Sequence, residues 1–180
     1  MKIIDHRLKN SHQKLSPNCS DRNKNEISLL VIHNISLPPG QFGGSYIDEF
    51  FCNKLDFDQH EFFAELKELK VSSHLLIKRG GEIVQYVPFN MQAWHAGESS
   101  FEGRDQCNEF SIGIELEGSD HEKFTDLQYQ ALIETTRELL KTYPQMNAKR
   151  IVGHSDIAPE RKTDPGPHFD WTQFRSKLER

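Results

Sequence analysis

The stretch SLLVIH, residues 28–33, indicates the fold class of this chain. Four consecutive apolar residues that include Val and Ile are typical of a short strand buried on both faces of a covered sheet. The sequence LPPG follows at residues 37–40. Because proline and glycine favour turns, we predict that a central strand ends at His33.

Four further strands are predicted downstream. Residues 74–78 and 82–87 are separated by the connection Arg-Gly-Gly, which suits an antiparallel hairpin. In residues 111–116 the apolar side chains alternate with a glycine and Glu115, so Glu115 faces away from the apolar side of its strand. Residues 150–154, RIVGH, predict one more short strand that ends at a histidine.

Helices are predicted between and after these strands. The spacing of apolar residues is helical in residues 46–53, 61–69, 126–142 and 171–178. The longest of these segments begins with a capping-box pattern, Thr125 with Gln128, and the last follows a capping aspartate. Interleaved strands and helices predict an α/β fold with a central mixed β-sheet flanked by α-helices.

One domain accounts for the chain, because 180 residues are enough for a single core. We expect residues 28–180 to form this domain. Residues 1–27 are polar with few apolar anchors, and we expect an irregular N-terminal lead-in across the surface.

Composition excludes several classes of partner. The chain has 22 Lys and Arg against 27 Asp and Glu, a net charge of -5, which is unsuited to binding a phosphate backbone. The N-terminal sequence MKIIDHR lacks an apolar stretch of signal-peptide length, and the apolar run at 29–32 is far shorter than a membrane span. Three widely spaced cysteines provide neither a disulfide framework nor a thiolate metal site. We therefore expect a cytoplasmic protein with no nucleic-acid or membrane partner.

Two histidines and an aspartate are candidate metal ligands. His33 and His154 each end a predicted buried strand, and loops that diverge beyond strand ends form ligand clefts. Asp164 precedes the stiff sequence Pro-Gly-Pro, which fixes the loop that carries it. Two imidazoles and one carboxylate leave a fourth position on zinc for water, as a hydrolytic site requires.

Two further side chains are candidates for catalysis. Lys162 lies two residues before Asp164, on the same side of an extended segment, where its ammonium group can stabilise negative charge on a carbonyl oxygen. Glu115, from a different strand, can take a proton from water. Spacing alone also fits a histidine bonded to a loop, an ordinary turn aspartate and a solvated lysine.

The chain resembles a known enzyme family over roughly residues 28–175. The matching strings are LLVIHNISLPPGQFGG (29–44), GEIVQYVPFN (81–90), AWHAG (93–97), CNEFSIGIELEG (107–118) and GHSDIAPERKTDPGP (153–167). These strings resemble the 1,6-anhydro-N-acetylmuramoyl-L-alanine amidases of peptidoglycan recycling, the AmpD type, within the wider zinc amidase and peptidoglycan-recognition-protein family.

The resemblance implies a function and a ligand set. It implies one zinc ion, Zn²⁺, per chain, held by His33, His154 and Asp164, with Glu115 and Lys162 assisting catalysis. The domain at residues 28–180 is then a zinc amidase domain. Its expected reaction is hydrolysis of the amide bond between (1,6-anhydro-)N-acetylmuramic acid and L-alanine of the stem peptide. The expected substrate is an anhydromuropeptide, and we expect the enzyme to be a monomer.

The resemblance also implies substrate-binding residues. Trp94 and His95, from AWHAG, are expected to line the cleft, where the indole can lie against the apolar face of the sugar. Lys70 and Gln106 stand where relatives often carry arginine, and neither reproduces the bidentate fork of a guanidinium. We expect Arg104 or Lys70 to contact the acidic stem peptide.

Two other functions remain open on sequence grounds. One alternative is a non-catalytic module that binds peptidoglycan fragments, because the wider family contains such members. The complete set of three candidate ligands together with Glu115 and Lys162 favours an enzyme. The other alternative is a zinc deacetylase or an amide hydrolase acting on an unrelated substrate, which cleavage of anhydromuropeptides would distinguish.

Overall fold

The computed structural model describes residues 1–178, so the last two residues of the predicted domain 28–180 lie outside the described residues. Its centre is a six-stranded sheet in the order β12-β5-β11-β6-β7-β3. The strands are β3 (His12–Gln13), β5 (Leu29–Ile35), β6 (Leu75–Ile77), β7 (Ile83–Gln85), β11 (Ser111–Glu117) and β12 (Ile151–Gly153).

The sheet is mixed, as the sequence predicts. Strands β12, β5, β11 and β6 are parallel to one another, β6 and β7 form the predicted antiparallel hairpin, and β3 runs parallel to β7. The longest pairing joins β5 and β11 over seven residues, with His33 opposite Glu115. Parallel strands end at the same edge of a sheet, so side chains from β5, β11 and β12 gather there.

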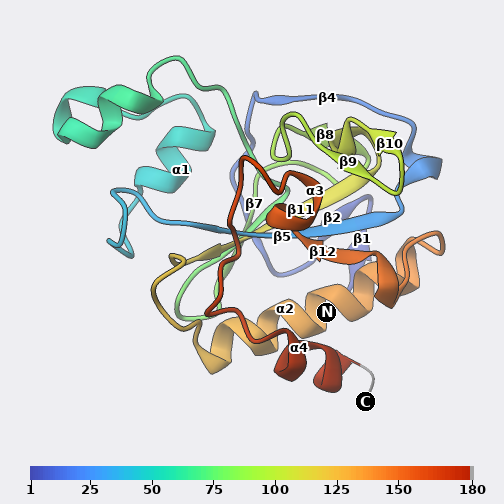
Figure 1. Ribbon diagram of the computed structural model, residues 1–180. Coiled ribbons are helices and arrows are strands. Elements are labelled where there is room, and N and C mark those ends of the chain that lie inside the picture. Colours follow the sequence, from blue (N-terminus) through green and yellow to red (C-terminus); the bar gives the residue numbers. More distant parts are fainter. Residues whose placement is uncertain (179–180) are drawn as a thin grey trace.

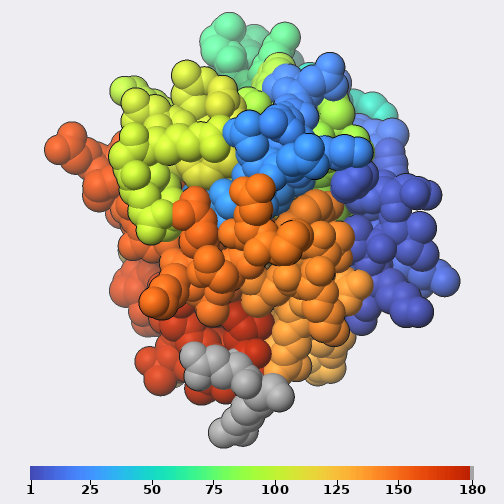
Figure 2. All heavy atoms as spheres, turned by 90° about the vertical axis from the view of Figure 1, so that its right-hand side faces the viewer, coloured from blue at the N-terminus to red at the C-terminus, as the bar shows by residue number. Residues whose placement is uncertain are grey.

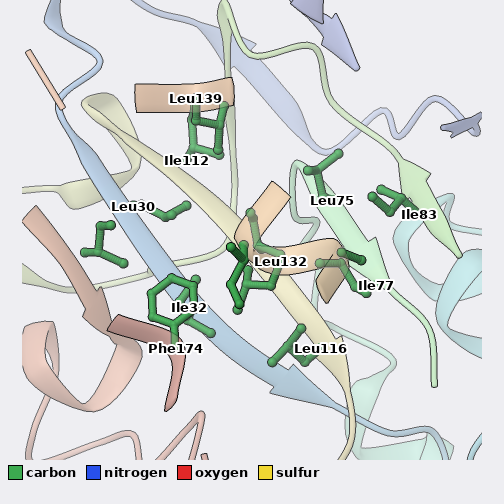
Figure 3. Close-up of a cluster of buried hydrophobic side chains, with 14 of the residues drawn as sticks. Leu30, Ile32, Leu75, Ile77, Ile83, Ile112, Leu116, Leu132, Leu139 and Phe174 are labelled. Atoms are coloured by element: carbon green, nitrogen blue, oxygen red, sulfur yellow. The ribbon is translucent and has the colours of Figure 1, made fainter. Parts of the chain in front are cut away.

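Helices α2 (Asp126–Thr142) and α4 (Trp171–Leu178) cover one face of the sheet (Figure 1). Both begin and end at the predicted residues, and the capping box of Thr125 and Gln128 is present. Alternate residues of the central strands, among them Leu30, Ile32, Ile112 and Leu116, point into the core between sheet and helices (Figure 3). Leu132 and Leu139 of α2 and Phe174 of α4 meet them there.

The opposite face is covered by short elements. These are α1 (Tyr46–Phe51), η2 (Phe57–Gln59), η3 (Glu61–Leu66), β8 (Met91–Ala93), β9 (Ser100–Phe101), β10 (Arg104–Asp105), η4 (Cys107–Glu109) and α3 (His154–Ile157). The short helix η5 (Ala148–Arg150) instead precedes β12 and accepts a hydrogen bond from Arg175 of α4. The segment predicted as a helix at 61–69 is a 3-10 helix that ends at Leu66. A second apolar cluster, with Phe51, Phe63 and Tyr86 buried in it, lies under α1 and η3.

The N-terminal residues correct the prediction of an irregular lead-in. They contain β1 (Ile3–Ile4), β2 (Arg7–Leu8), β3, β4 (Cys19–Asp21) and η1 (Lys24–Glu26). Strand β3 belongs to the main sheet, and β4 pairs with β8. In Figure 2 these residues, in dark blue, form one flank of the surface beside the orange α2. The polar composition did not indicate these strands, because strands of two or three residues at the edge of a sheet contain few apolar residues.

Within residues 1–178, no helix combines the length and the apolar character needed to cross a membrane.

Candidate active site

The site lies where the parallel strands end. In β5 the residues Leu29 and Val31 lie in the same apolar cluster, and His33 follows with the same alternation. In β11 the residues Ile112, Ile114 and Leu116 face the α2 side, so Glu115 faces the side of His33. His154 follows β12 directly as the first residue of α3.

Three donor atoms from distant parts of the chain meet at this edge. His33 Nδ1 lies 2.9 Å from Asp164 Oδ2 and 3.0 Å from His154 Nδ1, and His154 Nδ1 lies 3.1 Å from the same carboxylate oxygen. Both imidazoles are buried, and Asp164 is partly buried. The triangle has edges of about 3 Å, the spacing that donors need when each lies ~2.0–2.1 Å from one zinc ion.

The pKa shifts of His33 and Asp164 agree with a cation site. Burial lowers the pKa of His33, which keeps the imidazole neutral and able to donate a lone pair, although Asp164 opposes this shift. Burial alone would raise the pKa of Asp164, but hydrogen bonds with His154 and His33 outweigh it and hold the carboxyl below its usual range. The carboxylate is therefore ionised at neutral pH.

The loop that carries Asp164 is held against the start of α3. The amide of Ser155 donates to the Asp164 carbonyl at 3.0 Å. A Cβ atom at Gly153 would lie 2.7 Å from the Pro165 ring, so only glycine lets the loop pack this closely. Local backbone contacts thus bring residues 154 and 164 together.

Glu115 and Lys162 flank this triangle. The Glu115 carboxylate is buried, and its Oε2 atom has no hydrogen-bond partner among the described residues. Burial, reinforced by the charge of Asp164, raises the pKa of Glu115 well above its ordinary value, while Lys162 acts in the opposite direction. A carboxylate in this state is suited to accept a proton from a group that enters the cleft.

A cleft of about 710 Å³ opens beside the triangle. Asp164 and Lys162 both lie in its wall. Its apolar side is formed by Leu37, Phe50, Phe62 and Leu66, and its polar side includes Asn34, Ser119, Asp120, His121 and Arg161. The cleft therefore offers both aromatic rings and charged groups to a ligand.

The four residues predicted to bind substrate lie elsewhere among the described residues, and none of them lines this cleft. Trp94 donates its indole N–H to Ser20 at 3.1 Å, and Arg104 pairs with Glu26 at 2.7 Å. His95 is buried against His33, with 2.9 Å between His95 Nδ1 and His33 Nε2. Lys70 is exposed on the surface.

These placements have one physical cause. Each of the three engaged side chains is occupied by a partner far away in the sequence, with β4 and η1 supplying two of those partners. Because the N-terminal lead-in was expected to be irregular, its contacts with Trp94 and Arg104 could not be anticipated.

The sequence interpretation also missed two groups at the cleft. Asn34 donates to Asp120 Oδ1 at 2.7 Å, which ties the end of β5 to the loop after β11. Arg161 lines the cleft and donates to the carbonyls of Ala96 and Glu98 at 2.8 and 2.7 Å. Their positions beside His33 and Lys162 in the sequence were the available signal.

This arrangement defines a class of protein. An α/β domain in which two imidazoles and one carboxylate converge beside an open cleft, next to a buried glutamate, has the donor set of a mononuclear zinc hydrolase.

Comparison with known proteins gives the family. A family profile described as N-acetylmuramoyl-L-alanine amidase matches residues 23–167. The 1,6-anhydro-N-acetylmuramyl-L-alanine amidase AmpD of Haemophilus influenzae is 55% identical over 172 residues, which cover 95% of this chain and 94% of that protein. The enzyme of the same name from Escherichia coli is 61% identical over 82% of this chain and 80% of its own length. The chain belongs to the N-acetylmuramoyl-L-alanine amidase family.

Solved structures agree with this assignment. A crystal structure of a selenomethionine AmpD derivative superposes with a TM-score of 0.95 at 52% identity and covers 99% of both chains. The Escherichia coli amidase AmiD, in complex with the substrate anhydro-N-acetylmuramic acid-L-Ala-D-gamma-Glu-L-Lys, superposes with a TM-score of 0.63 at 34% identity. That likeness covers 84% of this chain and 57% of AmiD.

Proposed function

We propose that this chain hydrolyses the amide bond between (1,6-anhydro-)N-acetylmuramic acid and L-alanine of the stem peptide, in cytoplasmic peptidoglycan recycling, with one zinc ion held by His33, His154 and Asp164. The observation that carries the proposal is the convergence of these three donors beside the buried carboxylate of Glu115, whose Oε2 atom has no hydrogen-bond partner within residues 1–178. The family and the AmpD relatives give the substrate class.

The donor set suits zinc, because this borderline-soft cation binds both imidazole nitrogens and carboxylate oxygens, and three protein ligands leave a position open for water. When bound, zinc supplies Lewis acidity, which lowers the pKa of water and polarises an amide carbonyl. The polar and apolar walls of the cleft can hold the peptide and sugar portions of the substrate on either side of the scissile bond.

Glu115 and Lys162 have separate roles in the proposed reaction. Glu115 accepts a proton from the attacking water and passes it to the amine of the departing L-alanine. Its raised pKa allows the carboxyl to hold that proton between the two transfers. The Lys162 ammonium group, in the wall of the cleft, stabilises the negative charge that develops on the carbonyl oxygen. The step proceeds without a covalent enzyme intermediate.

A monomer suffices for this chemistry, since all five groups come from one chain. The three cysteines are free thiols, which supports a reducing compartment such as the cytoplasm. The non-catalytic alternative is disfavoured because a module that only binds has no use for a buried carboxylate without a partner. Residues 28–180 carry all five proposed active-site groups in this amidase domain, and β3 (His12–Gln13) completes its central sheet.

Incubation of the purified, zinc-loaded chain with an anhydromuropeptide tests the proposal. Mass spectrometry should detect free stem peptide and the sugar without its peptide, and metal analysis should give one zinc per chain. A folded, zinc-loaded sample that leaves the anhydromuropeptide intact would contradict the proposed function. Release of acetate instead of peptide would identify a deacetylase.

A further inference from the structure

The outer nitrogens of both candidate ligand histidines face one short segment, AWHAG, residues 93–97. His33 Nε2 lies 2.9 Å from the Nδ1 atom of His95. His154 Nε2 lies 3.0 Å from the carbonyl oxygen of Ala96. Two adjacent residues of this segment therefore contact the two imidazoles on the side away from the donor triangle.

The direction of these hydrogen bonds follows from proton accounting. A histidine that gives its Nδ1 lone pair to a metal carries its proton on Nε2. His33 Nε2 and His154 Nε2 are then donors, so both partners must accept. The Ala96 carbonyl is always an acceptor. His95 accepts only when its Nδ1 carries no proton, which leaves its own proton on Nε2, 3.1 Å from the Ser111 hydroxyl.

The surroundings of His95 hold its ring in this position. Its ring lies directly over Gly113, where a Cβ atom would come within 2.5 Å of His95 Cγ. The amides of His95 and Ala96 donate to a single acceptor, Asn108 Oδ1, at 3.1 and 2.8 Å. These two hydrogen bonds fix the backbone of the segment. The ring of His95 occupies the space that a side chain at residue 113 would otherwise fill.

We propose that His95 is a positioning residue that, together with the Ala96 carbonyl, fixes the orientation and tautomer of both zinc-binding imidazoles. The inference rests on the proposed function, because it concerns the same zinc site. It differs from a role in substrate binding, since His95 is buried behind His33 and does not line the cleft. Partners of this kind raise the basicity of a metal-binding histidine and restrict its rotation.

Three variants at one position test the inference. His95→Phe keeps an aromatic ring and removes the acceptor, His95→Asn keeps an acceptor at the δ position, and His95→Gln moves the polar group to the ε position. We expect zinc affinity, measured by chelator competition, to fall ~10–100-fold in the Phe and Gln variants and to stay near wild type in the Asn variant. If the Phe variant fails to fold, the difference in zinc affinity between the Asn and Gln variants still tests whether an acceptor at the δ position is required.

A spectroscopic measurement separates positioning from general stability. In the zinc-loaded wild type, long-range ¹H–¹⁵N spectra should show His33 protonated at Nε2, with that proton shifted downfield by its hydrogen bond. The proton should move upfield in His95→Phe and return in His95→Asn. Equal zinc affinity and unchanged His33 signals in all three variants would overturn the inference while leaving an active wild type as an amidase. A wild type that binds no zinc would instead overturn the proposed function and, with it, this inference.

Discussion

Glu115 occupies its place because of the alternation of one strand. Its neighbours Ile114 and Leu116 are buried on the α2 side, which turns the glutamate toward the cleft side without any loop or turn. A buried carboxylate with an unpartnered oxygen is costly, and proteins retain such groups mainly where they act. Removal of the Glu115 carboxylate should therefore lower turnover and leave zinc binding unchanged.

Replacing Glu115 with Gln keeps the size of the side chain and removes its ability to accept a proton. We expect kcat to fall by roughly 10²–10⁴ while zinc content stays at one per chain. Steady-state cleavage of an anhydromuropeptide and metal analysis of the same sample measure both quantities. Glu134→Gln, half-buried in α2 on the face of the sheet away from the site, is the matched control and should leave kcat unaltered. Wild-type turnover in Glu115→Gln would remove Glu115 from this role.

Single residues were predictable where position along a strand decides direction. His33, His154 and Glu115 follow from strand ends and alternation, and the structure brings them to one edge of the sheet. The resemblance placed Trp94, His95 and Arg104 at the cleft. In the structure each of these side chains contacts a partner that lies 62 to 78 residues away in the sequence, in another element. No local pattern carries that information.

At the scale of elements, β11 and the AWHAG segment fit together through Gly113. The close approach of the His95 ring leaves no room for a side chain there. An added atom at a site of this kind forces side chains away from their preferred rotamers and shifts the backbone. The glycine was read from sequence only as part of an alternating strand, because a strand pattern does not reveal what packs on top of it.

Gly113→Ala should lower the free energy of unfolding by ~1–3 kcal/mol, because the new methyl group collides with the His95 ring. Gly80→Ala is a suitable control, since its Cβ would meet only the flexible end of Glu82. Urea denaturation of the two variants compares them directly. Equal stability of Gly113→Ala and wild type would show that His95 is free to move aside.

Asp48, in α1, joins three elements. Its carboxylate is buried, accepts a hydrogen bond from the Tyr86 hydroxyl next to β7, and pairs with Lys14 at 2.7 Å and with Lys78 at 3.5 Å. Burial alone raises the pKa of Asp48, but the hydrogen bonds of Lys14 and Tyr86 with the charge of Lys78 outweigh it and lower the pKa below 3.8. The ionised carboxylate is thus the form that the fold stabilises.

The lowered pKa of Asp48 predicts a stability change at acid pH. Its contribution is fully present above the unfolded-state value, near 3.8, and is lost as the pH falls through the lower folded-state pKa. Asp48→Ala should cost about 1–3 kcal/mol at neutral pH, because the buried Tyr86 hydroxyl loses its acceptor. Denaturation curves at pH 7 and at about pH 2 measure the difference, which should shrink at the lower pH. A difference that is independent of pH would contradict a role for the charge.

At the scale of the whole molecule, the order and type of the elements were largely predictable. The hairpin of β6 and β7, the strand β11 and the helices α2 and α4 lie within a residue or two of their predicted bounds, because their periodicity is long or their caps are distinct. The N-terminal strands were not predictable. Strands of two or three residues show no period, and the pairing of β3 with β7 and of β4 with β8 is decided by the rest of the fold.

Zinc removal should destabilise the whole domain, because the proposed ligands lie in β5, at the start of α3 and in a loop near the C-terminus. Binding to the folded state alone adds roughly 4 kcal/mol at a free zinc concentration 1,000 times Kd. Calorimetry with and without a chelator measures the fall in Tm. His33→Ala should unfold at the same temperature in both conditions, and a chelator effect that persists in this variant would point to zinc bound elsewhere.

Strand β3 has a consequence beyond the site. It occupies the outer edge of the sheet, and the chain continues along β7 with the amides of Lys14 and Ser16 donating to the carbonyls of Gln85 and Tyr86 at 2.9 and 3.0 Å. An uncovered edge of this kind offers open hydrogen-bonding groups to a neighbouring molecule. The first sixteen residues cover the edge of β7 and prevent it from pairing with a strand of another molecule. A chain that lacks these residues would expose β7, and we expect it to aggregate although it keeps every proposed catalytic group.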